Sequence, residues 1–466
     1  MKLPSYIAGE AIQSDRELEV YYPWNNSLTG TVAKIGAPEL EKAIASADGE
    51  ELSRYERHAI LRKAAAMMTE RRAEFADLIR LETGLCAHDT DYETGRTSDV
   101  LEFAAIEALR DDGQVFSCDI SPQGKARKIV TFRQPVTLVA AITPFNHPLN
   151  QVAHKLAPAI AAGAPVLLKP SEKTPLTAIR FTELLYEAGL PGWMLSTFVG
   201  DLEDVVTPMI EHPTVELVSF TGSVSIGKQI AKTAGYKKTC LELGGNSPLI
   251  VLDDADLETA VTLAAEGSFR NSGQRCTAVK RILVQRGILE SFTQRFVEKA
   301  REYVCGDPAD PDTRVGTVID QAAAEQLKSR VDSCGGELLL GGGQRGALME
   351  PTVLKDVPRD SELVAQESFG PIAPIVPIDD LEDAIDYYNS GPFGLSSGIV
   401  TNDLNAALSA AKRLRTGTTN INDVPGFRIE SSPFGGVKDS GLGIKEGVIE
   451  SIKTMTNVKT FSFPWT

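Results

Sequence analysis

Apolar residues recur at helical spacing through the first quarter of the chain. Residues 1–50 begin with short strand-like pieces, YIAGEAI and LEVYYPW, and become helical at APELEKAIASADGE. From about Ser53 to Leu109 the pattern predicts helix almost throughout: one long amphipathic helix or a pair, then another helix capped at Ser98 or Asp99. Arg96 lies just ahead of that predicted cap and, taken alone, is one more charge on a solvated face.

Residues 115–135 break this helical rhythm. Two apolar, β-prone runs flank a Pro-Gln-Gly-Lys turn, which predicts a hairpin. A lone hairpin is marginal in water, so we expect it to pack on another subunit or domain. The C-terminal tail, KTMTNVKTFSFPWT, alternates like an edge strand that can pair with another subunit's sheet or hairpin.

Strands and helices then alternate. The buried run TLVAAITP is followed by a helix from about Leu149, and further strand and helix patterns continue to VELVSFTGSVSIGKQIAKTAG. This order predicts a doubly wound parallel sheet, the α/β class, in which nucleotides bind at the carboxyl ends of the strands. A second alternating set follows the strand KRILVQ, so we expect a separate α/β domain there.

Composition limits the partners. The chain has 47 Lys+Arg against 63 Asp+Glu, a formal net charge of −16, which argues against nucleic acid or an anionic membrane as partner. An anionic ligand therefore needs local cations. The cysteines lack CxxC or metal-like spacing, which favours reduced thiols in the cytoplasm and no metal site: Cys86, Cys118, Cys240, Cys276, Cys305 and Cys334. With no apolar leader and no run near the ~18 residues of a membrane helix, we expect a soluble, unprocessed protein.

Cys276 is the candidate nucleophile. It lies in the polar, glycine-containing loop FRNSGQRCTAV between apolar segments. Arg275 beside it, with Gly273 expected to loosen the backbone around it, is consistent with a cysteine held partly as thiolate, the form that attacks carbonyl carbon. The alternative is a half-buried structural cysteine.

Two further stretches carry candidate chemistry. In FTGSVSIG, a strand ends at Thr221 and Gly222, and a helix begins near Ser223 or Val224, whose free N–H groups suit a pyrophosphate. The spacing is not GxGxxG, and a structural turn is the alternative. In LELGGNS, Glu242 stands between apolar residues, either bonded to backbone or kept for acid/base chemistry.

LELGGNS and FRNSGQRC together resemble the two signatures of the aldehyde dehydrogenase superfamily. Further segments agree in the same order over essentially the whole chain: PFNHP with Asn146, KPSEKTPL with Lys169 and Glu172, FTGSVSIG with Gly222 and Ser223, ESFGP with Glu367 and Phe369, and PFGGVKDSG with Phe434. The resemblance implies a Rossmann-type cofactor domain, an α/β catalytic domain and a β oligomerisation arm.

The resemblance also implies a mechanism. Cys276 attacks the aldehyde carbon, while the oxyanion lies between the Asn146 amide and the Cys276 backbone N–H. Hydride leaves for the nicotinamide, and Glu242 as general base activates the water that hydrolyses the thioester to the acid. This glutamate argues against a coenzyme-A-acylating relative, which needs no activated water.

For the cofactor, the resemblance places Lys169 and Glu172 on the adenosine ribose, Gly222 and Ser223 at the pyrophosphate, and Glu367 with Phe369 at the nicotinamide ribose. It adds five residues along the same site: Thr143, Pro144, Ser171, Phe220 and Leu243. We expect NAD over NADP, because a carboxylate at Glu172 repels a 2′-phosphate, although Lys173 and Ser171 are close enough in sequence to offset this.

The substrate set departs from a generic family member. Arg96, His147, Arg275 and Arg428, with Thr277 and Phe434, resemble the subfamilies that act on phosphonated or phosphorylated aldehydes. Guanidinium forks bind tetrahedral oxyanions through paired charge-assisted hydrogen bonds; the alternative for each arginine alone is a surface salt bridge. We expect oxidation of phosphonoacetaldehyde to phosphonoacetate. Glyceraldehyde-3-phosphate, phosphonoformaldehyde, a sulfo-aldehyde, lactaldehyde and succinic semialdehyde remain alternatives.

The predicted organisation has three parts. Residues 1–114 and 136–244 form the NAD-binding domain, 245–452 the catalytic domain, and 115–135 with 453–466 the oligomerisation hairpin and C-terminal strand of a homodimer or homotetramer. The segment GLGIKEG departs from the family's GRE-type pattern, so Lys445 and Glu446 are expected to shift the charge that usually faces the position of Lys155. From other classes, a cysteine (thio)esterase without NAD and a non-catalytic homologue remain open.

Overall fold

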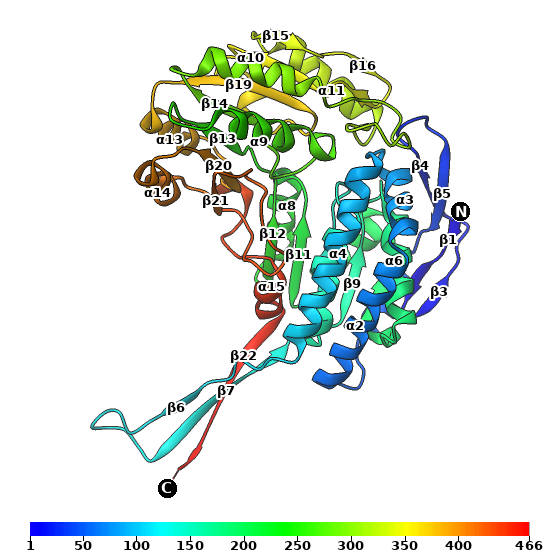
Figure 1. Ribbon diagram of the computed structural model, residues 1–466. Helices are drawn as coiled ribbons and strands as arrows, with labels where there is room; N and C mark the ends of the chain where they lie inside the picture. Colours follow the sequence, from blue (N-terminus) through cyan, green and yellow to red (C-terminus); the bar gives the residue numbers. More distant parts are fainter. Residues whose placement is uncertain (466) are drawn as a thin grey trace.

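The computed structural model describes residues 1–465, which form two α/β units and a protruding β arm (Figure 1). The first sheet has the strand order β12-β11-β8-β9-β10-β2-β3, with the five strands from β12 to β10 parallel. Its strands are β2 (Ser5–Ile7), β3 (Glu10–Ile12), β8 (Val139–Ile142), β9 (Val166–Lys169), β10 (Leu195–Thr197), β11 (Leu217–Thr221) and β12 (Lys238–Glu242).

Both faces of this sheet are buried, since successive strand residues enter different cores. Val139 and Ala141 of β8 pack with one set of helices, whereas Ala140 and Ile142 pack with the other. The first set is α2 (Arg54–Glu70), α3 (Arg72–Thr83), α4 (Ala87–Ala108), α5 (Asn150–Ala162) and α6 (Pro175–Glu187); the second is α1 (Ala37–Ala45), α7 (Thr207–Glu211) and α8 (Val224–Ala234). The predicted doubly wound parallel sheet is confirmed.

One boundary in the helical region is wrong. The predicted cap at Ser98 or Asp99 lies inside α4, which runs unbroken from Ala87 with Cys86 as its N-cap. The Ser98 hydroxyl donates to the carbonyl of Thr94 at 3.4 Å, one turn back, and so satisfies itself within the helix instead of ending it. Arg96 therefore lies in the interior of a long helix and not at its start.

The second sheet has the order β15-β18-β19-β14-β13-β20-β21 and is parallel except at β15. Its strands are β13 (Pro248–Val251), β14 (Arg281–Gln285), β15 (Glu337–Leu340), β18 (Thr352–Lys355), β19 (Ile372–Ile378), β20 (Ser396–Val400) and β21 (Thr418–Ile421). The helices of this part are α9 (Leu257–Phe269), α10 (Leu289–Ala300), α11 (Gln321–Ser333), α12 (Glu362–Ala365), α13 (Leu381–Ser390) and α14 (Leu404–Arg413). The expected second α/β region is present.

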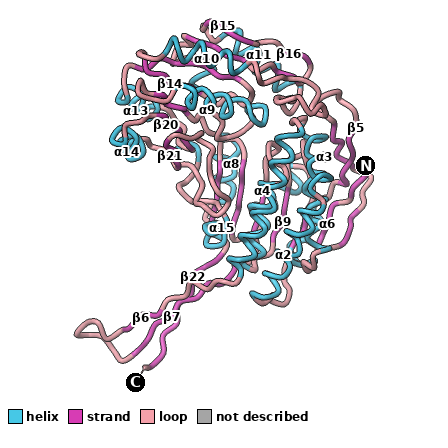
Figure 2. The backbone as a smooth tube through the Cα atoms, viewed as in Figure 1, coloured by secondary structure: helices cyan, strands magenta, loops and turns pink. Residues whose placement is uncertain are grey.

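The arm is a three-stranded sheet that projects from the body (Figures 1 and 2). Strand β6 (Val115–Ser117) pairs with β7 (Arg127–Pro135) in the predicted hairpin. The C-terminal strand β22 (Thr456–Pro464) pairs antiparallel with β7 along its whole length, so the tail completes its own chain's hairpin. Before it, α15 (Val448–Thr454) returns to the first unit, where Val448 joins the core formed with α4 and α5.

Smaller elements complete the chain. They are the sheet β1 (Lys2–Leu3), β4 (Glu17–Tyr21) and β5 (Leu28–Ala33), the pair β16 (Gln344–Arg345) and β17 (Leu348–Met349), and the short turns η1 (Gly192–Met194), η2 (Leu202–Val206) and η4 (Lys438–Ser440). Among residues 1–465, no helix combines the length and apolarity needed to cross a membrane.

Candidate active site

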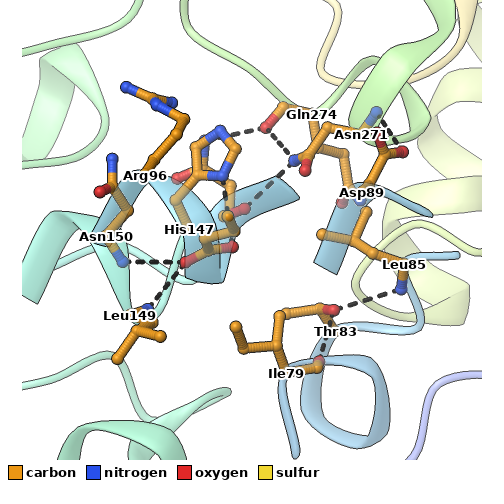
Figure 3. Close-up of polar contacts among 12 residues, drawn as sticks. Ile79, Thr83, Leu85, Asp89, Arg96, His147, Leu149, Asn150, Asn271 and Gln274 are labelled. Atoms are coloured by element: carbon orange, nitrogen blue, oxygen red, sulfur yellow. Dashed lines mark hydrogen bonds and ion pairs between the residues drawn. The ribbon is translucent and has the colours of Figure 1, made fainter. Parts of the chain in front are cut away.

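Cys276 lies in the loop that connects α9 to β14. The loop begins with the strained turn η3 (Arg270–Gly273), in which Asn271 and Ser272 have φ of 58° and 50°. Asn271 is held there because its N–H donates to Asp89 at 2.7 Å and its side-chain amide to the carbonyl of Asn146 at 3.1 Å (Figure 3). Strain maintained by buried polar contacts is common where a reactive side chain must be aimed.

Gly273 is required by close packing in this loop. Its φ is +67°, and a Cβ there would lie 2.0 Å from the carbonyl oxygen of Gly370. The loop that precedes Cys276 is thereby pressed against the segment that holds Glu367 and Phe369. The expected loosening of the backbone at Gly273 is wrong: the glycine permits a tight fit.

The two predicted oxyanion donors both have capacity to donate. The buried Asn146 amide donates one N–H to the carbonyl of Gln274 at 2.8 Å, which leaves its second N–H. In the described part of the chain, the backbone N–H of Cys276 has no hydrogen-bond partner. Donors fixed before charge develops stabilise an oxyanion more effectively than donors that must reorient.

The thiol of Cys276 is not held as thiolate in the free protein. Burial raises its pKa to about 11, and the charge of Glu367 acts in the same direction, while Arg428 and Arg275 only partly oppose them. The expectation that Arg275 lowers the pKa below its ordinary value is therefore wrong. Deprotonation must accompany ligand binding or proton transfer to a base.

Glu242 is the last residue of β12, and its carboxyl lies close enough to Cys276 for its charge to act on the thiol. Its side chain is 3% exposed, and neither carboxylate oxygen has a hydrogen-bond partner within residues 1–465. Burial raises its pKa well above the ordinary value, and the nearby charge of Glu446 adds to the rise. A Cβ on Gly435 would lie 2.4 Å from Glu242 Oε1, so glycine there keeps space beside the carboxylate. Once ionised, a carboxylate of raised basicity can accept a proton from water.

Lys155 and Glu446 form a buried ion pair. Lys155 Nζ donates to Glu446 Oε1 and to the hydroxyl of Ser219, both at 2.8 Å. Lys445 instead turns its Nζ to the carbonyls of Gly417 and Gly435. The expected displacement of charge in GLGIKEG is wrong, because Glu446 is registered by backbone hydrogen bonds in both directions with Phe434 and its carboxylate faces Lys155. The negative charge of Glu446 raises the pKa of Glu242.

The carboxyl ends of β8, β9 and β11 converge as a doubly wound sheet requires. Thr143 and Pro144 follow β8, Lys169 ends β9 with its Nζ 3.2 Å from Glu172, and Ser171 accepts from the N–H of Lys173. The hydroxyls of Thr143 and Thr221 are buried and have no partner in the described chain.

Helix α8 begins as predicted. Ser223 is its N-cap and accepts from the N–H of Ile226 at 3.4 Å, which leaves the hydroxyl hydrogen to donate elsewhere. A Cβ on Gly222 would lie 2.4 Å from the ring of Phe220, so only glycine fits there and no side chain covers the backbone before α8. Leu243 packs against Gly227 of α8. The unpaired hydroxyls of Thr143 and Thr221, the glycine turn at Gly222 and the free N–H groups at the start of α8 suit the phosphates and ribose of a dinucleotide.

Glu367 and Phe369 lie against the nucleophile's loop through Lys280, which the sequence analysis missed. Lys280 Nζ donates to the carbonyls of Gly273 and Ser368 at 2.7 and 2.8 Å, and lies 4.9 Å from the centre of the Phe369 ring. Burial lowers its pKa to about 8. Glu367 accepts from the N–H of Gly245 at 3.0 Å. Lys280 thus ties the cysteine loop to the segment predicted to hold the nicotinamide ribose.

A cavity of about 200 Å³ collects the predicted substrate residues Arg96, His147, Arg275 and Arg428. Arg96 and His147 approach from α4 and from the turn before α5 (Figure 3). Arg428 stacks over the ring of Phe434 at 4.2 Å. The side chains of Arg275 and Thr277 flank Gly426, where a Cβ would lie 2.3 Å from Arg275 Nη2.

The four arginines of this cavity differ in pairing. Arg96 pairs with Glu430, and Arg270 lies 3.6 Å from Asp89. Arg275 and Arg428 have no carboxylate partner among residues 1–465. Burial lowers the pKa of Arg275 to about 10, so it remains a cation at neutral pH. The surface salt-bridge alternative therefore does not describe these two residues.

Two carboxylates and a neutral imidazole complete the lining. Asp423 and Glu266 lie at the cavity without a cation partner in the described residues. Burial lowers the pKa of His147, whose Nδ1 faces Glu93 at 3.4 Å. Glu93 also accepts from the N–H groups of Leu149 and Asn150 at 2.8 and 2.9 Å, so it fixes the start of α5.

The sequence analysis missed several lining or supporting residues: Asp89, Tyr92, Glu93, Arg270 and Glu430. Asp89, Tyr92 and Glu93 stand seven, four and three positions before Arg96, which places them on the same face of one continuous helix. That signal was available, but the predicted cap at Ser98 or Asp99 concealed it.

Such a site suits an enzyme that forms a covalent bond through cysteine beside a bound dinucleotide. The chain belongs to the aldehyde dehydrogenase family, whose model matches residues 11–461. It is an oxidoreductase that uses NAD(P) to oxidise small aldehydes, and the suspected superfamily and fold are confirmed.

Several relatives cover nearly the whole chain. A 3-sulfolactaldehyde dehydrogenase of Priestia megaterium is 38% identical over 97% of this chain and 96% of its own. A sulfoacetaldehyde dehydrogenase of Neptuniibacter caesariensis is 37% identical over 94% and 97%. Among solved structures, a glyceraldehyde-3-phosphate dehydrogenase of Methanocaldococcus jannaschii complexed with NADP is 37% identical, with a TM-score of 0.91 over 97% of this chain and 100% of that one.

Proposed function

We propose that this protein oxidises a small aldehyde with an anionic, tetrahedral headgroup to its carboxylic acid. The observation that carries the proposal is the pair of unpaired guanidiniums, Arg275 and Arg428, in a cavity beside the Cys276 loop. Phosphonoacetaldehyde remains our expected substrate. Sulfo-aldehydes are the second candidate, because two relatives are named for them.

The proposed chemistry starts at Cys276. The Cys276 thiol gives up its proton to solvent or a base as the ligands bind, and the thiolate attacks the aldehyde carbon. The C=O π electrons move to oxygen, which accepts hydrogen bonds from the Asn146 amide and the Cys276 N–H. NAD(P) held at Gly222, Ser223, Glu367 and Phe369 would supply the acceptor for the hydride that leaves this carbon. A thioester remains on Cys276, Glu242 takes a proton from water as the water attacks, and the C–S bond breaks to release the acid.

The proposed cofactor site follows the predicted order. Lys169 and Glu172 hold the adenosine ribose, Gly222 and Ser223 the pyrophosphate, and Glu367 with Phe369 the nicotinamide ribose. The domain division predicted from sequence stays our proposal, with the cofactor held by the first unit and Cys276 presented by the second. The projecting arm, with Val115, Val458 and Phe461 exposed, supports the proposed homodimer or homotetramer.

NAD is expected to be preferred over NADP. Glu172 is 57% exposed at the carboxyl end of β9, and Lys173, which had seemed able to offset its charge, pairs with Asp320 at 2.9 Å. We therefore expect the Glu172 carboxylate, 3.2 Å from Lys169 Nζ, to repel a 2′-phosphate. We expect kcat/KM for NAD to exceed that for NADP about tenfold, measured from initial rates of absorbance at saturating aldehyde. A Glu172→Gln variant should narrow the ratio; an NADP preference in the wild type would reject the assignment.

Replacing Arg275 or Arg428 by methionine is expected to lower kcat/KM for phosphonoacetaldehyde about 10- to 100-fold, since each removes a charge-assisted hydrogen bond. Propanal, a neutral aldehyde of similar size, should lose far less. Steady-state kinetics with phosphonoacetaldehyde, sulfoacetaldehyde, succinic semialdehyde and propanal measure this.

Arg413→Met is the matched control, because that arginine pairs with Glu382 on α13, outside the cavity lining. If propanal is oxidised as efficiently as every anionic aldehyde, the proposal is wrong. Phosphonate and sulfonate can be separated by pH: only a phosphonate gains its second negative charge near neutral pH, by analogy with phosphate.

A further inference from the structure

Glu430 is a buried carboxylate that the proposed chemistry does not use. It is 4% exposed and lies in the irregular segment between β21 and α15, two residues after Arg428. One oxygen, Oε1, accepts from Arg96 Nε on α4 at 2.5 Å. The other, Oε2, lies 2.5 Å from His154 Nε2 on α5. One side chain therefore joins the loop to two helices of the first unit.

Its contacts leave the substrate-facing part of Arg96 free. The guanidinium uses Nε for Glu430, and neither terminal nitrogen has a hydrogen-bond partner within the described chain. An arginine held by Nε presents the two parallel N–H bonds of its terminal nitrogens. Because Arg96 lines the same cavity as Arg275 and Arg428, these N–H bonds are available for an anionic headgroup.

Glu430 is itself kept ionised and fixed. Burial opposes its ionisation, yet His154, Arg96 and Arg428 hold its pKa below the ordinary range. His154 is fully buried and burial lowers its pKa, so the neutral imidazole donates Nε2–H to Glu430. The backbone carbonyl of Glu430 also accepts from the N–H of Val448 at 3.0 Å, which holds the loop at the start of α15.

The loop so anchored carries other groups of the cavity. Arg428 precedes Glu430 by two residues, and Phe434, on which Arg428 stacks, follows by four. Gly426 lies against Arg275 and Thr277. A shift of Glu430 would move Arg96 and Arg428 together, whereas Cys276, Asn146 and Glu242 belong to other segments.

We propose that Glu430 is a positioning residue that sets the selectivity for anionic aldehydes by holding Arg96 through its Nε, while His154 fixes Glu430 itself. This rests on the proposed function, because it takes the cavity as the headgroup site. Glu430 touches no substrate and acts through Arg96. Glutamine at this position keeps the shape and loses the charge that binds both partners.

The test is a double-variant cycle in the full-length enzyme with its cofactor. Glu430→Gln, Arg96→Met and the double variant are compared by the ratio of kcat/KM for phosphonoacetaldehyde to that for propanal. Glu430→Gln should lower this ratio about tenfold, mainly through KM for the anionic substrate. In the Arg96→Met background, Glu430→Gln should lower it less than about threefold. Glu382→Gln, which loses an equivalent partner of Arg413, is the control and should leave the ratio unchanged.

The outcomes separate the two proposals. Equal losses for both aldehydes, or effects of Glu430→Gln and Arg96→Met that multiply independently, would mean that Glu430 only stabilises the fold and would overturn the inference. If Arg275→Met still lowers the ratio in that case, the proposed function stands. A wild-type enzyme without preference for the anionic aldehyde would overturn both. Unchanged thermal unfolding of Glu430→Gln accompanies the expected result.

Discussion

Cys276→Ala is expected to abolish aldehyde oxidation, with kcat at least about 10⁴-fold lower, since removing a covalent nucleophile leaves only binding and oxyanion stabilisation. Alanine fits the site, because Cys276 contributes no hydrogen bond from its thiol among the described residues. Cofactor affinity, measured by calorimetry, should stay within about threefold. Wild-type activity in this variant would refute covalent catalysis.

The state of the thiol gives the same prediction a second readout. With a pKa of about 11, Cys276 in the free protein is almost wholly protonated at neutral pH. Alkylation by iodoacetamide should therefore be slow near pH 7 and rise about tenfold per pH unit. The Cys276→Ala protein supplies the background from the other cysteines. A rate that levels off below pH 8 would show that the thiolate is already formed without ligands.

Glu242→Gln is expected to separate the two half-reactions. Hydride transfer needs no base at Glu242, so one equivalent of NADH should form in a burst, followed by turnover about 10²- to 10⁴-fold slower than in the wild type. Rapid mixing with absorbance detection measures both phases. Full steady-state activity would rule out Glu242 as the base that activates water.

The raised pKa of Glu242 fixes the sign of two pH effects. The carboxyl holds its proton above its ordinary range, so wild-type kcat should rise with pH as Glu242 ionises, and this limb should be absent in Glu242→Gln. Because the folded pKa exceeds the unfolded one, ionisation of Glu242 costs the native state stability as pH rises above the unfolded pKa. Glu242→Gln should therefore unfold at the same temperature or higher at pH 7. A lower unfolding temperature would mean that Glu242→Gln loses activity because its fold is destabilised.

Fold class, both sheets and the helix start at Ser223 could be predicted because apolar alternation and capping are local signals. Arg96, Arg275 and Arg428 of the cavity could be predicted from the resemblance to subfamilies that act on anionic aldehydes. What sequence could not supply was their pairing. Nothing local indicates that Glu430 takes Arg96, or that Lys280 reaches Gly273 and Ser368.

Three expectations that rest on local rules are wrong in the folded chain. A cation next to Cys276 suggested an acidic thiol, but removal from water outweighs Arg275. Ser98 looked like a helix cap, yet its hydroxyl bonds the preceding turn inside α4. The GLGIKEG segment seemed to misplace a charge, and only the backbone pairing of Glu446 with Phe434 shows which residue faces Lys155.

The pairing of β22 with β7 has a consequence for biosynthesis. Arg127 of β7 bonds Ser462 of β22 across 335 positions of sequence, so β7 emerges from the ribosome long before its partner. Until β22 is synthesised, β7 pairs, within residues 1–465, only with the three residues of β6 and keeps an open edge. Unpaired edges recruit other strands, and distant partners close slowly. A nascent chain that lacks β22 therefore has an aggregation-prone edge in this arm, and deletion of β22 should lower the soluble yield.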